Sequence, residues 1–334
     1  MSRIPLLKLP SLIQEEICCH LTVEESVLFS FLSKDLKKIM RLLRWDVMGI
    51  VYCFDTELLT IGFQTATTYD LPRRFKFLLD SKGGIYAVGY YENCKFLFEV
   101  QHRFSSENLP MQLQEHMLDM FSKCPNFQTF VAIEEMDEYK WVPFVNGVTF
   151  NNAKLADMEE FIGCQSELKR VSICHEITED LSLDLKVFHQ ENIVLDQLSK
   201  RPFTEYLKYF KGKHAIFGSQ TTVAHVHEFI QSFLDGTMSE NLKFVYIRQN
   251  PEYQDLFPNG ALLDNFETRQ WDQPELPTKY PMHQDVFDYL RLSDSMSLGP
   301  HSEYLKREKD EKVISISYDS KIFIAHIWDE GLGL

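Results

Sequence analysis

The amino-acid sequence predicts an α+β protein in which a short helical segment precedes a larger body of strands and helices. Three observations support this fold class. Residues 9–43 place apolar side chains at helical spacing, residues 47–100 form short β-type runs between turn residues, and a helix-then-strand order recurs farther along the chain. We therefore expect three regions, at residues 1–45, 46–108 and 109–334.

The first expected helix begins at Pro10 and Ser11. Proline suits the first turn, because the N–H that it lacks would have no partner inside the helix. Four apolar residues recur at intervals of four positions and form one stripe along this helix, with Leu12 beside them: Leu9, Ile13, Ile17 and Leu21.

Two further helices are expected before residue 45. Thr22 and Glu25 match the T-x-x-E capping box, which predicts the start of the second helix. Ser33 is the expected cap of the third helix. Asp35 in its first turn and Arg41 in its last turn have the signs that the helix dipole favours.

Helices this short cannot bury all of their apolar surface among themselves, because a unit of about 45 residues is close to the lower limit of independent stability. Two alternatives remain open at this point. The surplus apolar surface either packs on the rest of the chain or forms a docking site for a second protein, in the manner of a helix lying in a groove.

The order of residues in this region resembles an F-box over about residues 4–44. The resemblance rests on Pro5-Leu6-Leu7, Leu9-Pro10, Ile17, Leu21, Leu28 and Leu32-Ser33-Lys34. F-box proteins are substrate receptors of cullin-RING ubiquitin ligases of the SCF type, and the module binds a Skp-type adaptor. The resemblance implies eight adaptor-binding residues: Leu6, Leu9, Pro10, Ile13, Ile17, Leu21, Leu28 and Leu32.

Composition excludes several classes of partner. The net charge of −15 argues against nucleic acid, whose binding rests on cationic contacts, and against an anionic membrane surface. The seven cysteines are scattered without a C-x-x-C pair, so neither a disulfide framework nor a metal site is expected. No stretch approaches the ~20 apolar residues of a membrane span, and no signal-type run begins the chain. We expect a cytoplasmic or nuclear protein without a cofactor.

Residues 46–108 should form a small antiparallel sheet against which the N-terminal helices dock. The runs are short and β-branched or aromatic, and glycine or asparagine separates several of them. The expected strands are residues 47–54, 58–63, 75–79, 85–91 and 95–100.

From residue 109 a helix followed by a strand is expected three times. The helices are residues 111–124, 155–164 and 225–234, the strands that follow are 127–133, 168–173 and 242–247, and further strands are expected at 148–152 and 215–219. Apolar residues within the strands recur at offsets of three and five, as in leucine-rich repeats. The strand starts are unevenly spaced, so we predict a degenerate repeat, with an ordinary α/β domain as the alternative.

Two C-terminal segments resemble the nematode F-box-associated domain of the second type. The first is HAIFGSQTTVAHVHEFIQSFLDGTMSENLKFVYI, and the second combines residues 303–310 with the runs 313–316 and 323–328. The family's closing hairpin carries Asp-Gly, whereas Asp310-Glu311 stands here. We therefore expect an altered tight turn at this place.

Recognition of a target is expected on the side of the repeat strands that faces away from the core. Arg170, Phe244 and Tyr246 should point outward, and these residue types are enriched at interface hot spots. Residues 248–302 are expected to form a long loop with a short helix at 284–292.

Catalytic and metal sites are not expected. His225 and His227 point apart on a helix and should be solvated or capping residues, and no phosphate-binding or nucleophile motif occurs. The resemblance therefore implies a non-catalytic substrate receptor that holds an unknown target protein and, through the adaptor, a cullin. The alternative is a repeat-type scaffold unconnected to ubiquitin, whose N-terminal helices cap the stack.

Overall fold

A computed structural model describes residues 6–43, 45, 47–55, 58–65, 74–79, 85–91, 94–99, 109–124, 127–133, 144–175, 184–198, 201–219, 221–249, 262–271, 277, 279–281, 295–297 and 302–329. The chain divides into two compact units, which are described separately. The first comprises residues 1–157 and 164–167, and the second comprises residues 158–163 and 168–334.

Three helices begin the first unit, as predicted, and they are followed by a mixed α/β arrangement. They are α1 (Ser11–Cys19), α2 (Val23–Leu32) and α3 (Lys34–Leu42), preceded by the short 3-10 helix η1 (Leu6–Lys8). Both predicted caps form. The Glu25 N–H donates to Thr22 Oγ1 at 3.2 Å while the Thr22 N–H donates to Glu25 Oε2 at 2.8 Å. The Leu36 N–H donates to Ser33 Oγ at 3.0 Å, so local sequence determines where α2 and α3 begin.

The strands of the first unit form one mixed sheet in the order β7-β6-β1-β2-β3-β4-β5. The antiparallel run from β1 to β5 is confirmed close to its predicted bounds. However, β1 also pairs with β6 in parallel, so the expected boundary at residue 108 does not separate two packing units. The elements are β1 (Val47–Asp55), β2 (Leu58–Thr65), β3 (Arg74–Leu79), β4 (Ile85–Tyr91), β5 (Cys94–Glu99), α4 (Leu109–Met120), β6 (Gln128–Ile133) and β7 (Gly147–Phe150).

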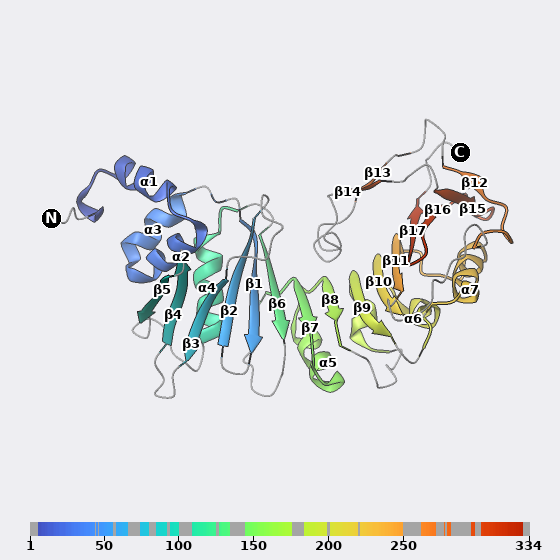
Figure 1. The fold of residues 1–334 in the computed structure, drawn as a ribbon, viewed down its shortest axis with the longest axis horizontal. Helices are drawn as coiled ribbons and strands as arrows, with labels where there is room; N and C mark the ends of the chain where they lie inside the picture. The colour runs from blue at the N-terminus through green and yellow to red at the C-terminus, as the bar shows by residue number, and fades with distance from the viewer. Residues whose placement is uncertain are drawn as a thin grey trace. The chain divides into compact units, whose positions relative to one another are not determined.

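Helix α4 joins the N-terminal helices to this sheet (Figure 1). On the sheet side, the buried Gln114 side chain donates to Thr129 Oγ1 of β6 at 2.8 Å. On the other side, Ser30 of α2 is 2.7 Å from His116 Nε2. The sequence predicted docking on the sheet of residues 46–108, whereas the hydrogen bond of Ser30 and the ion pairs of Lys37 and Arg41 link the N-terminal helices to α4.

Asp119 of α4 forms a second link to the N-terminal helices. Its carboxylate lies 2.7 Å from Lys37 Nζ and 3.0 Å from Arg41 Nη1, both on α3. The hydrogen bond from Lys37 is the main cause of a lowered pKa for Asp119. Two cations of α3 therefore converge on one partly exposed carboxylate and link α3 to α4.

The second unit contains a mixed sheet in the order β8-β9-β10-β11-β17-β16-β15-β12. Strands β8 to β11 are parallel and adjacent in chain order, whereas β17, β16, β15 and β12 continue the sheet antiparallel. The strands are β8 (Arg170–Ile173), β9 (Asn192–Leu198), β10 (His214–Ser219), β11 (Phe244–Gln249), β12 (Arg269–Gln270), β15 (Glu303–Lys306), β16 (Val313–Tyr318) and β17 (Ile322–Trp328).

Two repeat-like elements were not predicted from the sequence, namely β9 and helix α6 (Phe203–Tyr209). With them included, the strands from β6 to β11 follow one another at similar intervals, and the longest interval precedes β11. Their first residues are Gln128, Gly147, Arg170, Asn192, His214 and Phe244. The prediction that the strand starts are strongly uneven in spacing was therefore wrong. The predicted spacing was uneven because β9 and α6, which lie between residues 168 and 242, had not been predicted.

Helices lie on one face of the second sheet, where α6 and α7 (Val223–Leu234) pack through phenylalanine (Figure 1). The Phe203 ring of α6 is 5.8 Å from that of Phe217 on β10. The Phe229 ring of α7 is 5.8 Å from that of Phe323 on β17. The connection between β8 and β9 contains the 3-10 helix η3 (Lys186–His189). Helix α5 (Leu155–Cys164) includes residues assigned to each of the two units.

The expected loop over residues 248–302 contains short strands. Strand β12 joins the edge of the sheet, and β13 (Lys279–Pro281) pairs antiparallel with β14 (Ser295–Ser297) in a separate ladder. The helix predicted at residues 284–292 lies outside the described residues.

The turn between β15 and β16 departs from the usual glycine turn, as the Asp310-Glu311 pair predicted. Glu311 has φ of 59°, in the left-handed region that favours glycine. The Glu311 N–H donates to the Arg307 carbonyl at 2.9 Å, and the Arg307 N–H donates to the Lys312 carbonyl at 2.8 Å. The turn therefore closes with an unfavourable residue at its tightest position.

Replacing Glu311 by glycine should stabilise the protein. A non-glycine residue in the left-handed region costs roughly 1 kcal/mol of stability, and Glu311→Gly would remove this cost. Part of the gain is offset, because glycine gives the unfolded chain more conformational entropy and because the Lys306–Glu311 ion pair is lost. We expect about 0.5 kcal/mol of added stability in urea unfolding. Glu308→Gly in the same turn should instead lower stability, because it relieves no positive φ. Equal effects of the two substitutions would contradict this explanation.

Candidate functional site

The N-terminal helices leave a group of large apolar side chains in contact with solvent. Leu12 is 77% exposed, Ile13 47% and Ile17 43% on α1, and Leu7 of η1 is 47% exposed. Ile13 and Ile17 are four residues apart and share one side of the helix. We call these four residues the N-terminal apolar face. Exposed apolar side chains that gather on one surface often mark a binding site.

The other side of α1 is fixed to its surroundings. Cys18 is fully buried, and burial raises the pKa of its thiol. Near the start of α1, the Gln14 side-chain amide donates to the Leu9 carbonyl at 2.7 Å. Helix α1 therefore has an anchored side and an apolar side that is left open.

The eight predicted adaptor-binding residues differ in exposure. Four are exposed, namely Pro10, Ile13, Ile17 and Leu32, the last at the end of α2. The other four are partly buried: Leu6, Leu9, Leu21 and Leu28. Leu12, the most exposed large apolar residue of the group, was not among the predicted contacts. Its position beside the apolar stripe was the signal that could have included it.

The predicted target-binding residues do not form an exposed face. Phe244 is fully buried and Tyr246 is 9% exposed, so their expected outward orientation is wrong, while Arg170 is partly buried. The physical reason is that β11 is an interior strand, with β10 on one side and β17 on the other. Apolar residues from β9, β10 and β17 cover Phe244 and Tyr246: Val194, Ile216, Ile322, Ile324 and Trp328.

Phe244 lies between two buried histidines on the same face of the sheet. Its ring centroid is 6.3 Å from that of His214 and 5.1 Å from that of His326. His214 Nδ1 is 2.6 Å from Asn192 Oδ1 on β9. Burial, with a smaller contribution from His214, lowers the pKa of His326 to about 3. His326 is therefore neutral in the folded protein at every physiological pH.

Burial of His326 should make the protein sensitive to acid. Its pKa is lower in the folded state than in the unfolded state, so unfolded chains take up the proton first as pH falls below 6.5. Stability from this group is present above pH 6.5 and is lost progressively toward pH 3, with roughly 2 kcal/mol lost at pH 5.

The check is the free energy of unfolding at pH 8 and pH 5, measured by urea titration. His326→Leu should reduce the difference between the two pH values by about 2 kcal/mol. The control His189→Gln alters an exposed histidine and should leave the difference unchanged. An unchanged difference in His326→Leu would mean that His326 is not the titrating group.

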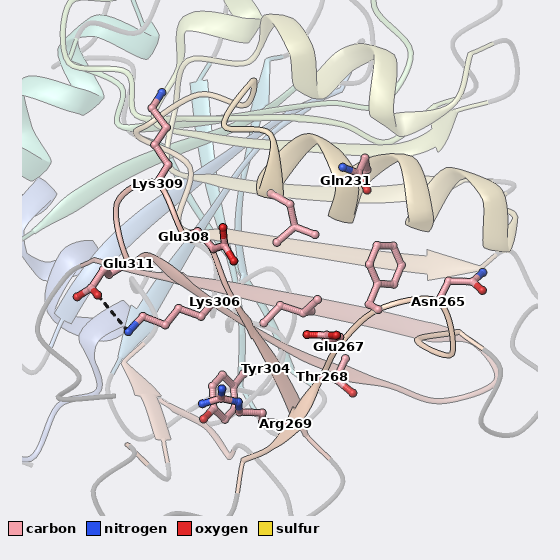
Figure 2. A pocket seen from close by; sticks show the side chains of 13 residues that line it. Gln231, Asn265, Glu267, Thr268, Arg269, Tyr304, Lys306, Glu308, Lys309 and Glu311 are labelled. Carbon is pink, nitrogen blue, oxygen red and sulfur yellow. Dashed lines mark ion pairs between the residues drawn. The ribbon is translucent and has the colours of Figure 1, made fainter.

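A groove lies at the edge of the second sheet, with a volume of about 1290 Å³ (Figure 2). We call it the edge groove. It is formed by residues of α7, of β12 and the segment before it, of β15 and of the β15–β16 turn: Gln231, Leu234, Asn265, Phe266, Glu267, Thr268, Arg269, Tyr304, Leu305, Lys306, Glu308, Lys309 and Glu311. No local sequence signal indicates this groove, because its walls come from segments as distant in the chain as α7 and the β15–β16 turn.

Among the described residues, no group of three or more histidine, cysteine, aspartate or glutamate side chains is placed to hold a metal ion. His225 caps α7 by accepting a hydrogen bond from the Thr222 N–H at 3.3 Å, as predicted, and His227 Nε2 is 2.7 Å from the Leu262 carbonyl oxygen. None of the helices described is long and apolar enough to cross a membrane.

Comparisons with family models, with curated proteins and with solved structures gave no match for this chain.

Proposed function

We propose that this protein is a non-catalytic substrate receptor of an SCF-type ubiquitin ligase. In this proposal the N-terminal helices bind a Skp-type adaptor, and the remainder of the chain binds a target protein. Joining the two partners would raise the effective concentration of the target near the ubiquitin-charged enzyme. The observation that carries the proposal is the N-terminal apolar face, which lies within the segment that resembles an F-box.

The exposed apolar area provides a reason for binding. Covering the remaining exposed half of an isoleucine or leucine side chain contributes roughly 1 kcal/mol. Leu12, Ile13, Ile17 and Leu32 together would contribute about 4 kcal/mol before the costs of association. That contribution is absent in the isolated chain and becomes available when a partner covers these side chains.

We further propose that the α/β body is a short leucine-rich-repeat-type array. Support comes from strand starts that recur at intervals close to the ~20–29 residues of such repeats, and from four successive parallel strands in chain order. A degenerate array would also explain why a 3-10 helix replaces an α-helix between β8 and β9. Stacked units of this type provide an extended binding surface.

The alternative is a scaffold unconnected to ubiquitin, in which the N-terminal helices cap the chain end. Buried residues such as Phe31, Leu36 and Ile39 fit a cap. A cap does not account for the open side of α1, because a cap should present a polar outer surface. Deleting residues 1–45 does not distinguish a docking module from a cap. The deletion would also remove the contacts of Ser30 and Lys37 with α4 and so could destabilise the chain in either case.

Isothermal titration calorimetry of the full chain with a purified Skp-type adaptor tests the proposal. We expect a one-to-one complex at about 10 µM protein and a negative heat-capacity change, because binding buries apolar surface. Absence of a complex under these conditions would reject the ligase assignment and favour the scaffold alternative.

A further inference from the structure

We propose that the edge groove binds a target segment through a lysine or arginine side chain of that segment. The inference rests on the proposed function, because it names the class of partner that the receptor would hold. It concerns a different surface from the N-terminal apolar face, so the two proposals can fail separately.

The groove combines apolar lining with carboxylates. Leu234, Phe266 and Leu305 supply apolar surface, of which Leu305 is almost completely buried and the other two are partly exposed. Such a surface suits the methylene stem of a lysine or arginine, whose charged head stays near polar groups. An aromatic ring at the same place adds attraction for a cation.

Two glutamates face the interior of the groove. Glu267 and Glu308 are exposed, and neither forms an ion pair with another residue in the described part of the chain. Figure 2 shows both side chains at the central space of the groove, approached from different segments. A cationic side chain that enters this space would be attracted by both carboxylates.

The basic residues of the groove do not cancel this charge. Lys306 Nζ is 3.4 Å from Glu311 Oε1, so its charge is already compensated. In Figure 2 Lys309 points away from the space between Glu267 and Glu308, and Arg269 lies beside Tyr304 at the far end. The lining thus has three acidic and three basic residues, and in Figure 2 Glu267 and Glu308 face the centre while Lys309 and Arg269 lie at the margins.

The charge of the whole chain favours the same class of partner. A net charge of −15 attracts basic segments over a distance and speeds their association. An acidic segment would meet repulsion both at long range and at the centre of the groove. We infer that the occupant is a basic segment of a target polypeptide with apolar residues beside its lysine or arginine.

Fluorescence polarisation with labelled decapeptide pools tests this inference on the full-length protein. The sixth position is fixed as Lys, Arg, Met or Glu, and the other positions are varied. We expect the Lys and Arg pools to bind about fivefold more tightly than the Met and Glu pools, with the difference shrinking at high salt. Equal binding of all four pools overturns the inference.

Three variants locate the effect. Glu267→Gln/Glu308→Gln should abolish the preference for Lys and Arg, whereas Glu160→Gln/Glu240→Gln makes the same charge change at glutamates outside the groove and should preserve it. Glu267→Lys/Glu308→Lys should reverse the preference toward the Glu pool. A preference that persists in the first variant, or does not reverse in the last, contradicts the inference.

Adaptor binding distinguishes this inference from the proposed function. The groove variants should form the adaptor complex as the wild type does, because the N-terminal apolar face is unchanged. Absence of the peptide preference in wild-type protein that still binds adaptor rejects the groove alone. Peptide preference without adaptor binding rejects the ligase assignment alone.

Discussion

Ile13→Asp/Ile17→Asp should weaken binding of the Skp-type adaptor by about a hundredfold or more. Both side chains are nearly half exposed in the free protein, so the substitution removes less internal packing than it would at a buried position. In the complex, however, each aspartate would lose hydration inside an apolar contact, which costs more than the lost isoleucine contact alone. The effect should therefore fall on affinity, while the midpoint of thermal unfolding changes little.

Lys34→Gln/Lys38→Gln is the matched control. It changes the net charge by the same amount at two positions, also four residues apart, on α3. Adaptor affinity measured by calorimetry should stay within about twofold of the wild type. Comparable weakening in both variants would show that net charge, and not the apolar face, governs binding.

Arg307→Met should lower the free energy of unfolding by about 3 kcal/mol. Arg307 is only 7% exposed, and it joins the β15–β16 turn to α7. Its Nε and Nη2 donate to the two carboxylate oxygens of Asp310 at 2.7 and 2.5 Å. Its Nη1 donates to the Phe233 carbonyl at 2.9 Å, and its guanidinium lies 4.9 Å from the centroid of the Phe233 ring.

Methionine fills similar volume but removes the guanidinium donors, so the Phe233 carbonyl keeps only its backbone donor, the Gly236 N–H, and Asp310 keeps the Lys312 N–H. The last turn of α7 would lose a hydrogen bond to one of its terminal carbonyls, and Asp310 would lose its bidentate partner. Urea unfolding should show the loss, whereas Lys309→Met in the same turn should change stability by less than about 0.5 kcal/mol. A small effect in Arg307→Met would mean that the turn and α7 are held by other contacts.

The same pair predicts behaviour in acid. Arg307 lowers the pKa of Asp310 from 3.8 to about 2. A carboxyl group with a depressed pKa in the folded state stabilises the protein above its unfolded pKa and loses that contribution as pH falls. The contribution of Asp310 should therefore disappear between about pH 4 and pH 2, and this component should be missing in Arg307→Met.

Short-range signals predicted much of the N-terminal structure correctly. The capping box of Thr22 and Glu25 and the cap at Ser33 depend on residues three positions apart, so the sequence contains all of the information required. The antiparallel strands β1 to β5 were predictable because each pairs with the next strand along the chain. Parallel pairing of β1 with β6 was missed because β2 to β5 and α4 lie between them in the chain.

Helices too short to show a clear helical period in the sequence were also not predicted. The connection before β9 uses the four-residue η3, and α6 has only seven residues, which is too short for a clear helical period. The alternation of side-chain directions along β11 does not by itself show which of its side chains are exposed. Phe244 and Tyr246 are buried because β17, which comes after five further strands in the chain order of the described elements, lies beside them.

The candidate sites differ in how much the sequence reveals. The apolar stripe of α1 is visible in the sequence, but its exposure depends on which side of the helix is anchored at Cys18. The edge groove depends on three distant segments that come together only in the fold. Local patterns therefore predicted the first site in part and could not indicate the second.

Hydrogen–deuterium exchange of the full chain with and without the Skp-type adaptor tests the central claim most directly. We predict strong protection of backbone amides over residues 6–32, which contain η1, α1 and α2, with little change at the edge groove. Exchange that is unchanged over residues 6–32 when the adaptor is in excess, or protection confined to other parts of the chain, would contradict the assignment of the N-terminal apolar face as the adaptor-binding site.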